Sequence, residues 1–159
     1  MKEAMPHNRW LFFGTFLFFL ILDQAVKAWV RTSLFEHQSP GFPWPGVFEI
    51  TLTYNKGIAF GMYQGFGVLF APIAIIITLF SIFGSYRNPS APRLFHFSLG
   101  LVAAGAIGNL IDRLWLGKVT DMFWFRLINF PVFNVADACI SVAAILLAWY
   151  WIFGEGRSS

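Results

Sequence analysis

Three of the four aspartates in this chain lie within one short stretch, and they are the side chains best suited to carry out chemistry. They are Asp112, Asp121 and Asp137. Two carboxyl groups held within a few ångströms of each other cannot both ionise easily, so one of them keeps a proton at neutral pH. The ionised group can then draw a proton from water while the protonated group polarises a peptide carbonyl. Such a pair hydrolyses amides without a metal or a cofactor, and none is expected here.

Other hydrolytic schemes have less support in the sequence. A serine or cysteine nucleophile needs a histidine partner, but His7, His37 and His96 are expected in a tail, in a long loop and at the opposite membrane face. The chain has no HExxH motif and no pair of histidines at ligand spacing, so zinc is not predicted. The one cysteine, Cys139, lies in an apolar segment, where a buried structural residue is the ordinary interpretation.

Each aspartate also has an ordinary structural interpretation. Asn134 and Asp137 are three residues apart, which resembles a capping box at the start of a helix. Asp112 stands next to Arg113 at a predicted helix end, where the two can form an ion pair, and Asp121 can be a solvated loop acid. Spacing alone therefore leaves the carboxylate site as one candidate.

The composition is that of a membrane protein. Of 159 residues, 57% are hydrophobic and 12% are charged, which leaves too little polar surface to cover a soluble globule. The net charge is +3, but the 11 Lys and Arg residues are scattered singly among apolar segments. Because they form no patch, nucleic acid is not predicted as a partner. Contact with the anionic headgroups of membrane lipids explains these charges better.

The apolar pattern predicts an all-α membrane protein of four transmembrane helices, forming a single domain over residues 1–159. The predicted spans are residues 10–30, 66–86, 94–114 and 135–153. A secretory signal peptide must be considered for the first span. No small-x-small cleavage site follows it, however, and the helical pattern continues through Asp23, Gln24 and Lys27. At about 1.5 Å per residue, a retained helix of this length spans roughly 30 Å of hydrocarbon.

Polar and small residues mark the helix faces that should meet inside the bundle. Asp23 and Lys27 are four residues apart and share a face, which predicts an ion pair that can also support the site. In the third span a row of small residues recurs every fourth position and is continued by Asp112: Gly100, Ala104 and Gly108. Such a row lets another helix come close, so the polar end of this helix should point into the bundle.

Two predicted loops, residues 31–65 and 115–134, lie on one side of the membrane and should cover the site. Within the first, residues 48–54 alternate apolar and polar side chains, which predicts a half-buried strand on the membrane surface. The strand leads to Asn55 and Gly57, for which ordinary turn chemistry is the local interpretation. Lys and Arg are denser in the short segments on the side of the termini, which predicts cytoplasmic termini and an extracytoplasmic site.

Five segments, taken in order, resemble those of the bacterial lipoprotein signal peptidase family, also called signal peptidase II. The segments are Asp23-Gln24 and residues 55–61, 105–113, 119–121 and 133–137. The resemblance extends over nearly the whole chain. One departure is Met122, which stands where the family usually has phenylalanine. This change keeps an apolar, flexible side chain.

The resemblance implies an aspartic endopeptidase of the bacterial cytoplasmic (inner) membrane. Such an enzyme removes signal peptides from prolipoproteins, cutting before a cysteine that already carries diacylglycerol. Asp121 and Asp137 would be the catalytic dyad. The residues that would hold the dyad and the substrate, or support them from the first helix, are Asn55, Gly57, Asn109, Asp112, Arg113, Asn134, Asp23 and Lys27. Binding of globomycin-type cyclic peptides is also implied, and nothing demands more than a monomer.

Two other classes of protein stay open on the residues alone. Four short helices with membrane carboxylates also suit a small proton-coupled transporter, usually a dimer. A transport carboxylate should lie near the bilayer midplane, whereas the clustered aspartates fall at one edge of the apolar segments. A structural membrane scaffold would not need the cluster at all. Cleavage of a diacylglyceryl-modified precursor separates the three.

Overall fold

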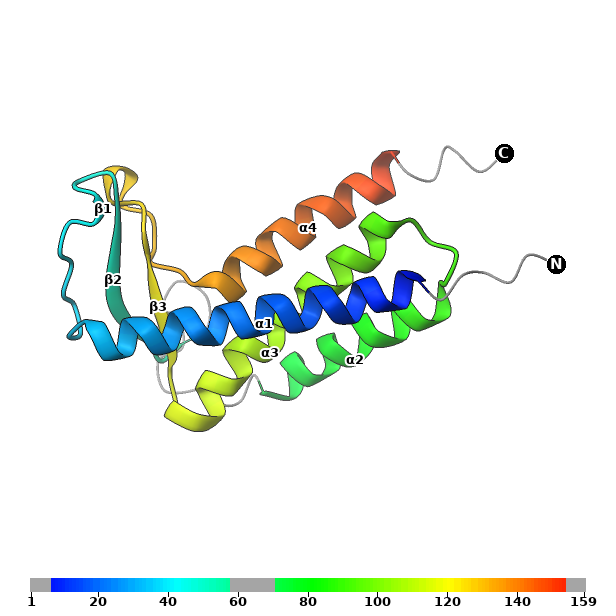
Figure 1. The fold of residues 1–159 in the computed structure, drawn as a ribbon, viewed down its shortest axis with the longest axis horizontal. Helices are drawn as coiled ribbons and strands as arrows, with labels where there is room; N and C mark the ends of the chain where they lie inside the picture. Colours follow the sequence, from blue (N-terminus) through cyan, green and yellow to red (C-terminus); the bar gives the residue numbers. More distant parts are fainter. Residues whose placement is uncertain (1–6, 58–70, 154–159) are drawn as a thin grey trace.

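The computed structural model describes residues 7–57 and 71–153 as a bundle of helices with a small sheet at one end (Figure 1). The helices are α1 (His7–Ser33), α2 (Ala71–Arg87), α3 (Arg93–Leu116) and α4 (Val135–Phe153). The strands are β1 (Pro43–Trp44), β2 (Phe48–Asn55) and β3 (Val119–Trp124), and a short 3-10 helix, η3 (Arg126–Ile128), follows β3. The predicted fold class, an all-α membrane protein with a small β segment, is confirmed.

Three of these helices, α1, α3 and α4, are long and apolar enough to cross a membrane. The fourth, α2, has 17 residues. Its span was predicted to begin at residue 66, and residues 66–70 lie outside the described part of the chain. In α2 the buried side chains are Thr78, Ser81 and Ser85, while Ile76 and Phe80 are exposed. A helix with polar side chains inside and apolar ones outside is suited to lipid.

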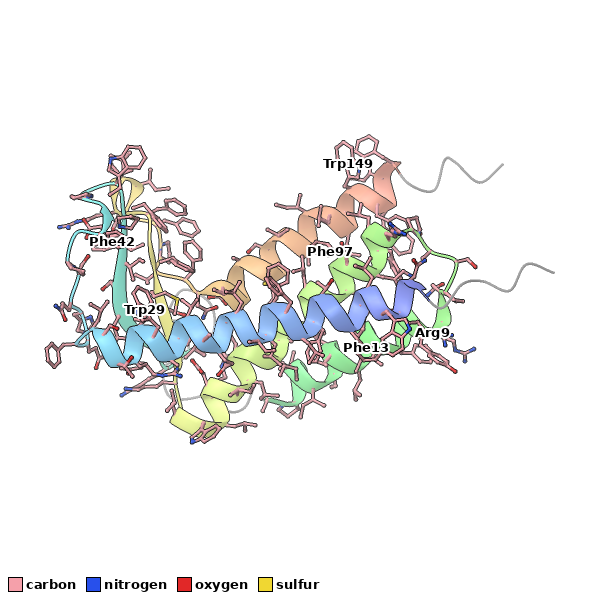
Figure 2. All side chains as sticks on the ribbon, in the orientation of Figure 1. Arg9, Phe13, Trp29, Phe42, Phe97 and Trp149 are labelled. Atoms are coloured by element: carbon pink, nitrogen blue, oxygen red, sulfur yellow. The ribbon has the colours of Figure 1, made fainter. Side chains whose placement is uncertain are left out.

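Large aromatic side chains are exposed at both ends of the bundle. Figure 2 shows Phe42 beside the sheet and Trp149 near the opposite end of the molecule. Their exposed fractions are 60% and 59%. Aromatic residues concentrate where a membrane meets water. Exposed aromatic side chains at both ends are therefore consistent with a bundle that crosses the bilayer and carries its sheet at one membrane surface.

The central helix is α3, which contacts α1, α2 and α4. Glycines permit the closest of these contacts. A Cβ atom added to Gly105 would lie 2.5 Å from the Ala136 carbonyl oxygen, and one added to Gly108 would lie 2.6 Å from Asp23 Oδ2. Gly100 is similarly close to α1. The small-residue row predicted in the third span is therefore confirmed as a face on which α1 and α4 pack closely.

The sheet has the strand order β1-β2-β3, and both pairs are antiparallel. The strand predicted over residues 48–54 is confirmed as β2. The third strand corrects the prediction, because residues 115–134 were expected to be loop. Instead, β3 pairs with β2 and sets Asp121 opposite Thr53. The partner strand is distant in sequence, so no local pattern reveals this pairing.

Two helices extend beyond their predicted spans. Residues 31–33 belong to α1 and residues 115–116 belong to α3, although both segments were predicted to be loop. The extra turn of α1 brings Arg31 within 3.5 Å of Asp112. The end of α3 is fixed by Gly117, whose φ is +69° and whose N–H donates to the Arg113 carbonyl oxygen. A left-handed glycine in this position is a common helix terminator.

Replacing Gly105 with alanine should destabilise the protein, because the added methyl group would lie 2.5 Å from a backbone oxygen of α4. We expect a loss of about 1–3 kcal/mol in the free energy of unfolding, seen as a lower melting temperature in detergent. Gly14→Ala on α1 is the matched control, since its added Cβ meets nothing within 4 Å. Equal melting temperatures for wild type and Gly105→Ala would contradict the close contact.

Candidate active site

A cavity of about 800 Å³ lies among α2, α3, α4 and the ends of β2 and β3. Five predicted site residues line it: Asn55, Asn109, Arg113, Asp121 and Asp137. Most of the remaining wall is apolar and is contributed by the three helices and by residues 130–133. A mainly apolar cavity with a few polar groups suits a ligand that has an apolar body and one polar point of reaction.

Asn134 connects the two predicted catalytic carboxyl groups. Its side-chain Nδ2 donates to Asp121 Oδ1 at 2.7 Å, and its backbone N–H donates to Asp137 Oδ2 at 3.3 Å. In return, the Asp137 backbone N–H donates to Asn134 Oδ1 at 2.9 Å. The capping box predicted at the start of α4 is therefore confirmed. The same contacts also join Asp121 on β3 to Asp137 on α4, so the helix cap and the candidate site are one structure.

Asn109 joins Asp137 to the interior of the bundle. Its Nδ2 donates to Asp137 Oδ1 at 2.8 Å. Its Oδ1 accepts hydrogen bonds from Asn134 Nδ2 and from Lys27 Nζ, each at 3.0 Å. Every polar atom of this side chain thus has a partner, which fixes its position in the cavity wall.

Behind the cavity lies the predicted ion pair of α1. Lys27 Nζ is 2.9 Å from Asp23 Oδ2, and neither side chain is more than 1% exposed. The other oxygen, Asp23 Oδ1, accepts the backbone N–H of Ala136 in the first turn of α4 at 2.9 Å. Asp23 therefore supports the site through the helix that carries Asp137.

Asp112 lies behind the cavity as well, and its surroundings differ from the expected pair with Arg113. Lys27 Nζ and Arg31 Nη1 each lie 3.5 Å from its carboxylate. The Thr120 backbone N–H donates to Asp112 Oδ2 at 2.8 Å, which fixes the start of β3. Arg113 lines the cavity, and its Nη1 donates to the Asn109 carbonyl oxygen at 3.4 Å.

Asn55 and Gly57 lie at the end of β2. The Gly57 N–H donates to Asn55 Oδ1 at 2.9 Å, which is the turn chemistry expected from the sequence. Asn55 lines the cavity, and its side chain hydrogen-bonds Asp121. Gly57 thus contributes the turn that follows Asn55. The remainder of the segment that resembles the family, residues 58–61, and the rest of the expected cover, residues 62–65, lie outside the described residues.

Asp121 is not a solvated loop acid, because it lies on β3 and is 3% exposed. Burial, followed by the negative charge of Asp137, raises the pKa of Asp121 from its ordinary value to about 8. Hydrogen bonds from Asn134 and Asn55 and the positive charge of Lys27 oppose this shift. Burial and the charge of Asp137 thus both favour the protonated form of Asp121.

Some residues that shape the site were not found from the sequence. Arg31 Nη1 donates to Thr120 Oγ1 at 2.9 Å, and the Thr120 carbonyl oxygen accepts from Asn134 Nδ2 at 3.3 Å. Residues 130–133 form part of the cavity wall. Thr120 lies within the segment 119–121 that resembles the family, but no role was expected for it, and Arg31 stands at no distinctive spacing. The pairing of β2 with β3 is the signal that would have located Thr120.

Comparison of the sequence with known proteins gives one consistent result. Residues 15–153 match the family described as "Signal peptidase (SPase) II". A protein of Gloeothece citriformis named "Lipoprotein signal peptidase" is 38% identical over 144 residues, which cover 90% of this chain and 89% of that protein. A protein of the same name from Microcystis aeruginosa is 39% identical over 141 residues, covering 88% of this chain and 90% of that protein.

Comparison with solved structures finds the same fold in bacterial membrane enzymes. A solved structure described as a bacterial membrane enzyme determined by the in meso method at 2.3 Å resolution has a TM-score of 0.84 and 26% sequence identity. It covers 93% of this chain, which in turn covers 91% of it. A second such structure, at 1.9 Å resolution, has a TM-score of 0.76 and 27% identity, with coverage of 89% and 92%.

Asp23→Asn should destabilise the protein strongly, because it leaves the Lys27 ammonium buried beside an uncharged amide. Breaking a buried ion pair by removing one partner costs roughly 3–5 kcal/mol of unfolding free energy. Glu36→Gln is the matched control, since Glu36 is 49% exposed and its one ion pair within the described residues is with His37, at 3.9 Å. Thermal unfolding in detergent measures both variants. If their melting temperatures were the same, the proposed importance of the buried pair would be wrong.

Proposed function

Because the chain belongs to the signal peptidase II family, we propose that it cleaves prolipoproteins at the peptide bond before a diacylglyceryl-modified cysteine, using Asp121 and Asp137. The observation that carries the aspartic mechanism is that both carboxyl groups line one cavity and are joined through Asn134. The transporter alternative is not favoured, since this is a peptidase family. The site is also at the end of the bundle that carries the sheet, away from the middle of the helices.

Asp137 acts as the base in this proposal. Its two oxygens accept N–H groups from Asn109 at 2.8 Å and from Asn134 at 3.3 Å. These contacts fix the position of the carboxylate that is proposed to take the proton from water. Asp121 acts as the acid, because burial and the charge of Asp137 raise its pKa to about 8. The two carboxyl groups then hold one proton between them at neutral pH.

The proposed reaction forms a C–O bond, breaks the C–N bond and passes protons through both aspartates. Asp137 takes a proton from water while the water oxygen bonds to the carbonyl carbon, and Asp121 gives its proton to the carbonyl oxygen. The tetrahedral intermediate is therefore neutral. When it collapses, the C–N bond breaks, Asp137 passes its proton to the leaving nitrogen of the cysteine, and one hydroxyl of the intermediate returns a proton to Asp121. Both carboxyl groups end in the state in which they began.

Arg113 is proposed to hold the substrate backbone. It lines the same cavity as the two aspartates. Its Nε is buried and has no hydrogen-bond partner within the described segments. A buried donor without an acceptor is costly. A peptide carbonyl oxygen entering the cavity would supply that acceptor, which supports a binding role for this side chain.

The position of the cavity suits a substrate that remains in the bilayer. Asp137 lies in the first turn of α4, and residues 138–153 add about 24 Å of mostly apolar helix beyond it. We place the termini in the cytoplasm of a bacterium and the site near the extracytoplasmic face of its inner membrane. There the apolar part of a prolipoprotein can stay in lipid while the scissile bond meets water. Globomycin-type cyclic peptides are expected to occupy the same cavity.

Asp121→Asn and Asp137→Asn should each abolish cleavage of a diacylglyceryl-modified precursor, because an amide can neither accept the proton from water nor donate an acidic one. We expect the rate to fall about 10²- to 10⁴-fold. The assay is the mobility shift of purified precursor incubated with enzyme in detergent. Cys139→Ala, at a buried position outside the cavity wall, should retain the wild-type rate. Full activity in either aspartate variant would remove that residue from the mechanism.

Cleavage should slow as the pH rises through about 8. The pKa of Asp121 is raised to about 8, so its protonated form persists up to that pH and is lost above it. Because the proposed acid then disappears, kcat should fall about tenfold for each further pH unit. The measurement is kcat from roughly pH 6 to pH 10 in an uncharged detergent. A rate that stayed constant over this range would show that Asp121 is not the acid.

A further inference from the structure

Lys27 does not line the cavity, yet it is connected to it. Its ammonium group is completely buried and lies 2.9 Å from Asp23 Oδ2 and 3.5 Å from Asp112 Oδ2. It also donates to Asn109 Oδ1 at 3.0 Å and to the Gly108 carbonyl oxygen at 3.3 Å. The contact with Asp112 would by itself be enough to join α1 to α3. The contact with Asn109 also links Lys27 to the cavity, because the Asn109 side chain belongs to the cavity wall.

A lysine ammonium group can only donate hydrogen bonds, so Lys27, together with the Nδ2 of Asn134, determines which way the Asn109 amide faces. The amide oxygen must face Lys27, so the NH₂ group must face Asp137, whose Oδ1 it meets at 2.8 Å. The opposite orientation would set the NH₂ group against the ammonium and the oxygen against the carboxylate. Both of those contacts are repulsive.

We propose that Lys27 is a positioning residue for the cleavage reaction. Together with Asn134, it holds the oxygen of Asn109 and so keeps an N–H donor on Asp137, which fixes the position of the carboxylate that acts as the base. The inference rests on the proposed function, because it assumes that Asp137 takes a proton from water. It assigns to a residue of α1 an effect on a carboxylate of α4 that Lys27 does not itself contact.

The charge of Lys27 has a second effect on the site, because it opposes the upward shift in the pKa of Asp121. Removal of that charge should therefore move the alkaline limb of activity to higher pH. The charged groups around this cluster are Asp23 and Arg31 on α1, Asp112 and Arg113 on α3, Asp121 on β3 and Asp137 on α4. Arg31 shares Asp112 with Lys27 but makes no contact with Asn109 among the described hydrogen bonds.

The experiment must separate positioning from folding, and a double variant does so. Lys27→Met alone leaves Asp23 and Asp112 without the ammonium group, so both the melting temperature and kcat should fall. Asp23→Asn combined with Lys27→Met removes one charge of each sign, and replacing a whole buried pair costs little stability. The amide oxygen at position 23 can still accept the Ala136 N–H. We expect this double variant to recover most of the melting temperature while kcat stays roughly 10- to 100-fold below wild type.

A structural role for Lys27 gives a different result. In that case kcat would recover together with the melting temperature in the double variant, and the proposal would be overturned. The alkaline midpoint of kcat gives a second readout, which should move to higher pH in Lys27→Met. Arg31→Gln is the comparison variant, because it removes contacts to the same Asp112 and to Thr120 Oγ1 without touching Asn109. Its midpoint should equal that of the wild type, and a shift as large as that of Lys27→Met would also overturn the proposal.

Asn109→Asp tests the same link without disturbing the lysine. The new carboxylate keeps a partner for Lys27 but presents an oxygen to Asp137, so kcat should be low at neutral pH and should rise as the pH falls. Wild-type kcat in this variant would overturn the proposal even if neither Lys27 variant folded. Different results would contradict the proposed function itself. The wild-type enzyme would then leave a diacylglyceryl-modified precursor intact, or Asp137→Asn would cleave it.

Discussion

A lysine ammonium group removed from water is the constraint on which the rest of this structure depends. An isolated buried charge is very costly, so Lys27 must be surrounded by acceptors. Two of them are the carboxylates of Asp23 on α1 and Asp112 on α3. Each carboxylate also accepts a backbone N–H from another element, Ala136 of α4 and Thr120 of β3 respectively. Compensating one charge thus fixes the relative positions of three helices and one strand.

The same compensation explains why the helices must approach so closely. Lipid is as apolar as a leucine side chain, so helices in a membrane gain little from burying apolar surface against one another. Close packing and hydrogen bonds must hold them together. Gly105 and Gly108 remove the side chains that would keep α3 away from Ala136 and Asp23. The polar contacts of α1, α3 and α4 are short because these two positions carry no Cβ.

The sequence was informative wherever the signal was local. Long apolar runs predicted the helices, the alternation over residues 48–54 predicted β2, and the four-residue spacing predicted the pair of Asp23 with Lys27. Pairing between distant segments was not predicted, because no spacing within residues 115–134 reveals that β3 lies against β2. For the same reason Asp121 was assigned to a polar loop. The resemblance to a family identified Asp121 and Asp137 as a pair, and their proposed roles follow from that resemblance and from the contacts of Asn109 and Asn134.

The hydrogen bond from the Ala136 N–H to Asp23 Oδ1 joins residues 113 positions apart in the chain. Its acceptor therefore leaves the ribosome well before its donor does. While a nascent chain still lacks α4, the carboxylate of α1 has no partner there, and neither Asn134 nor Asp137 exists to meet Asn109. The site therefore cannot assemble until α4 has been synthesised.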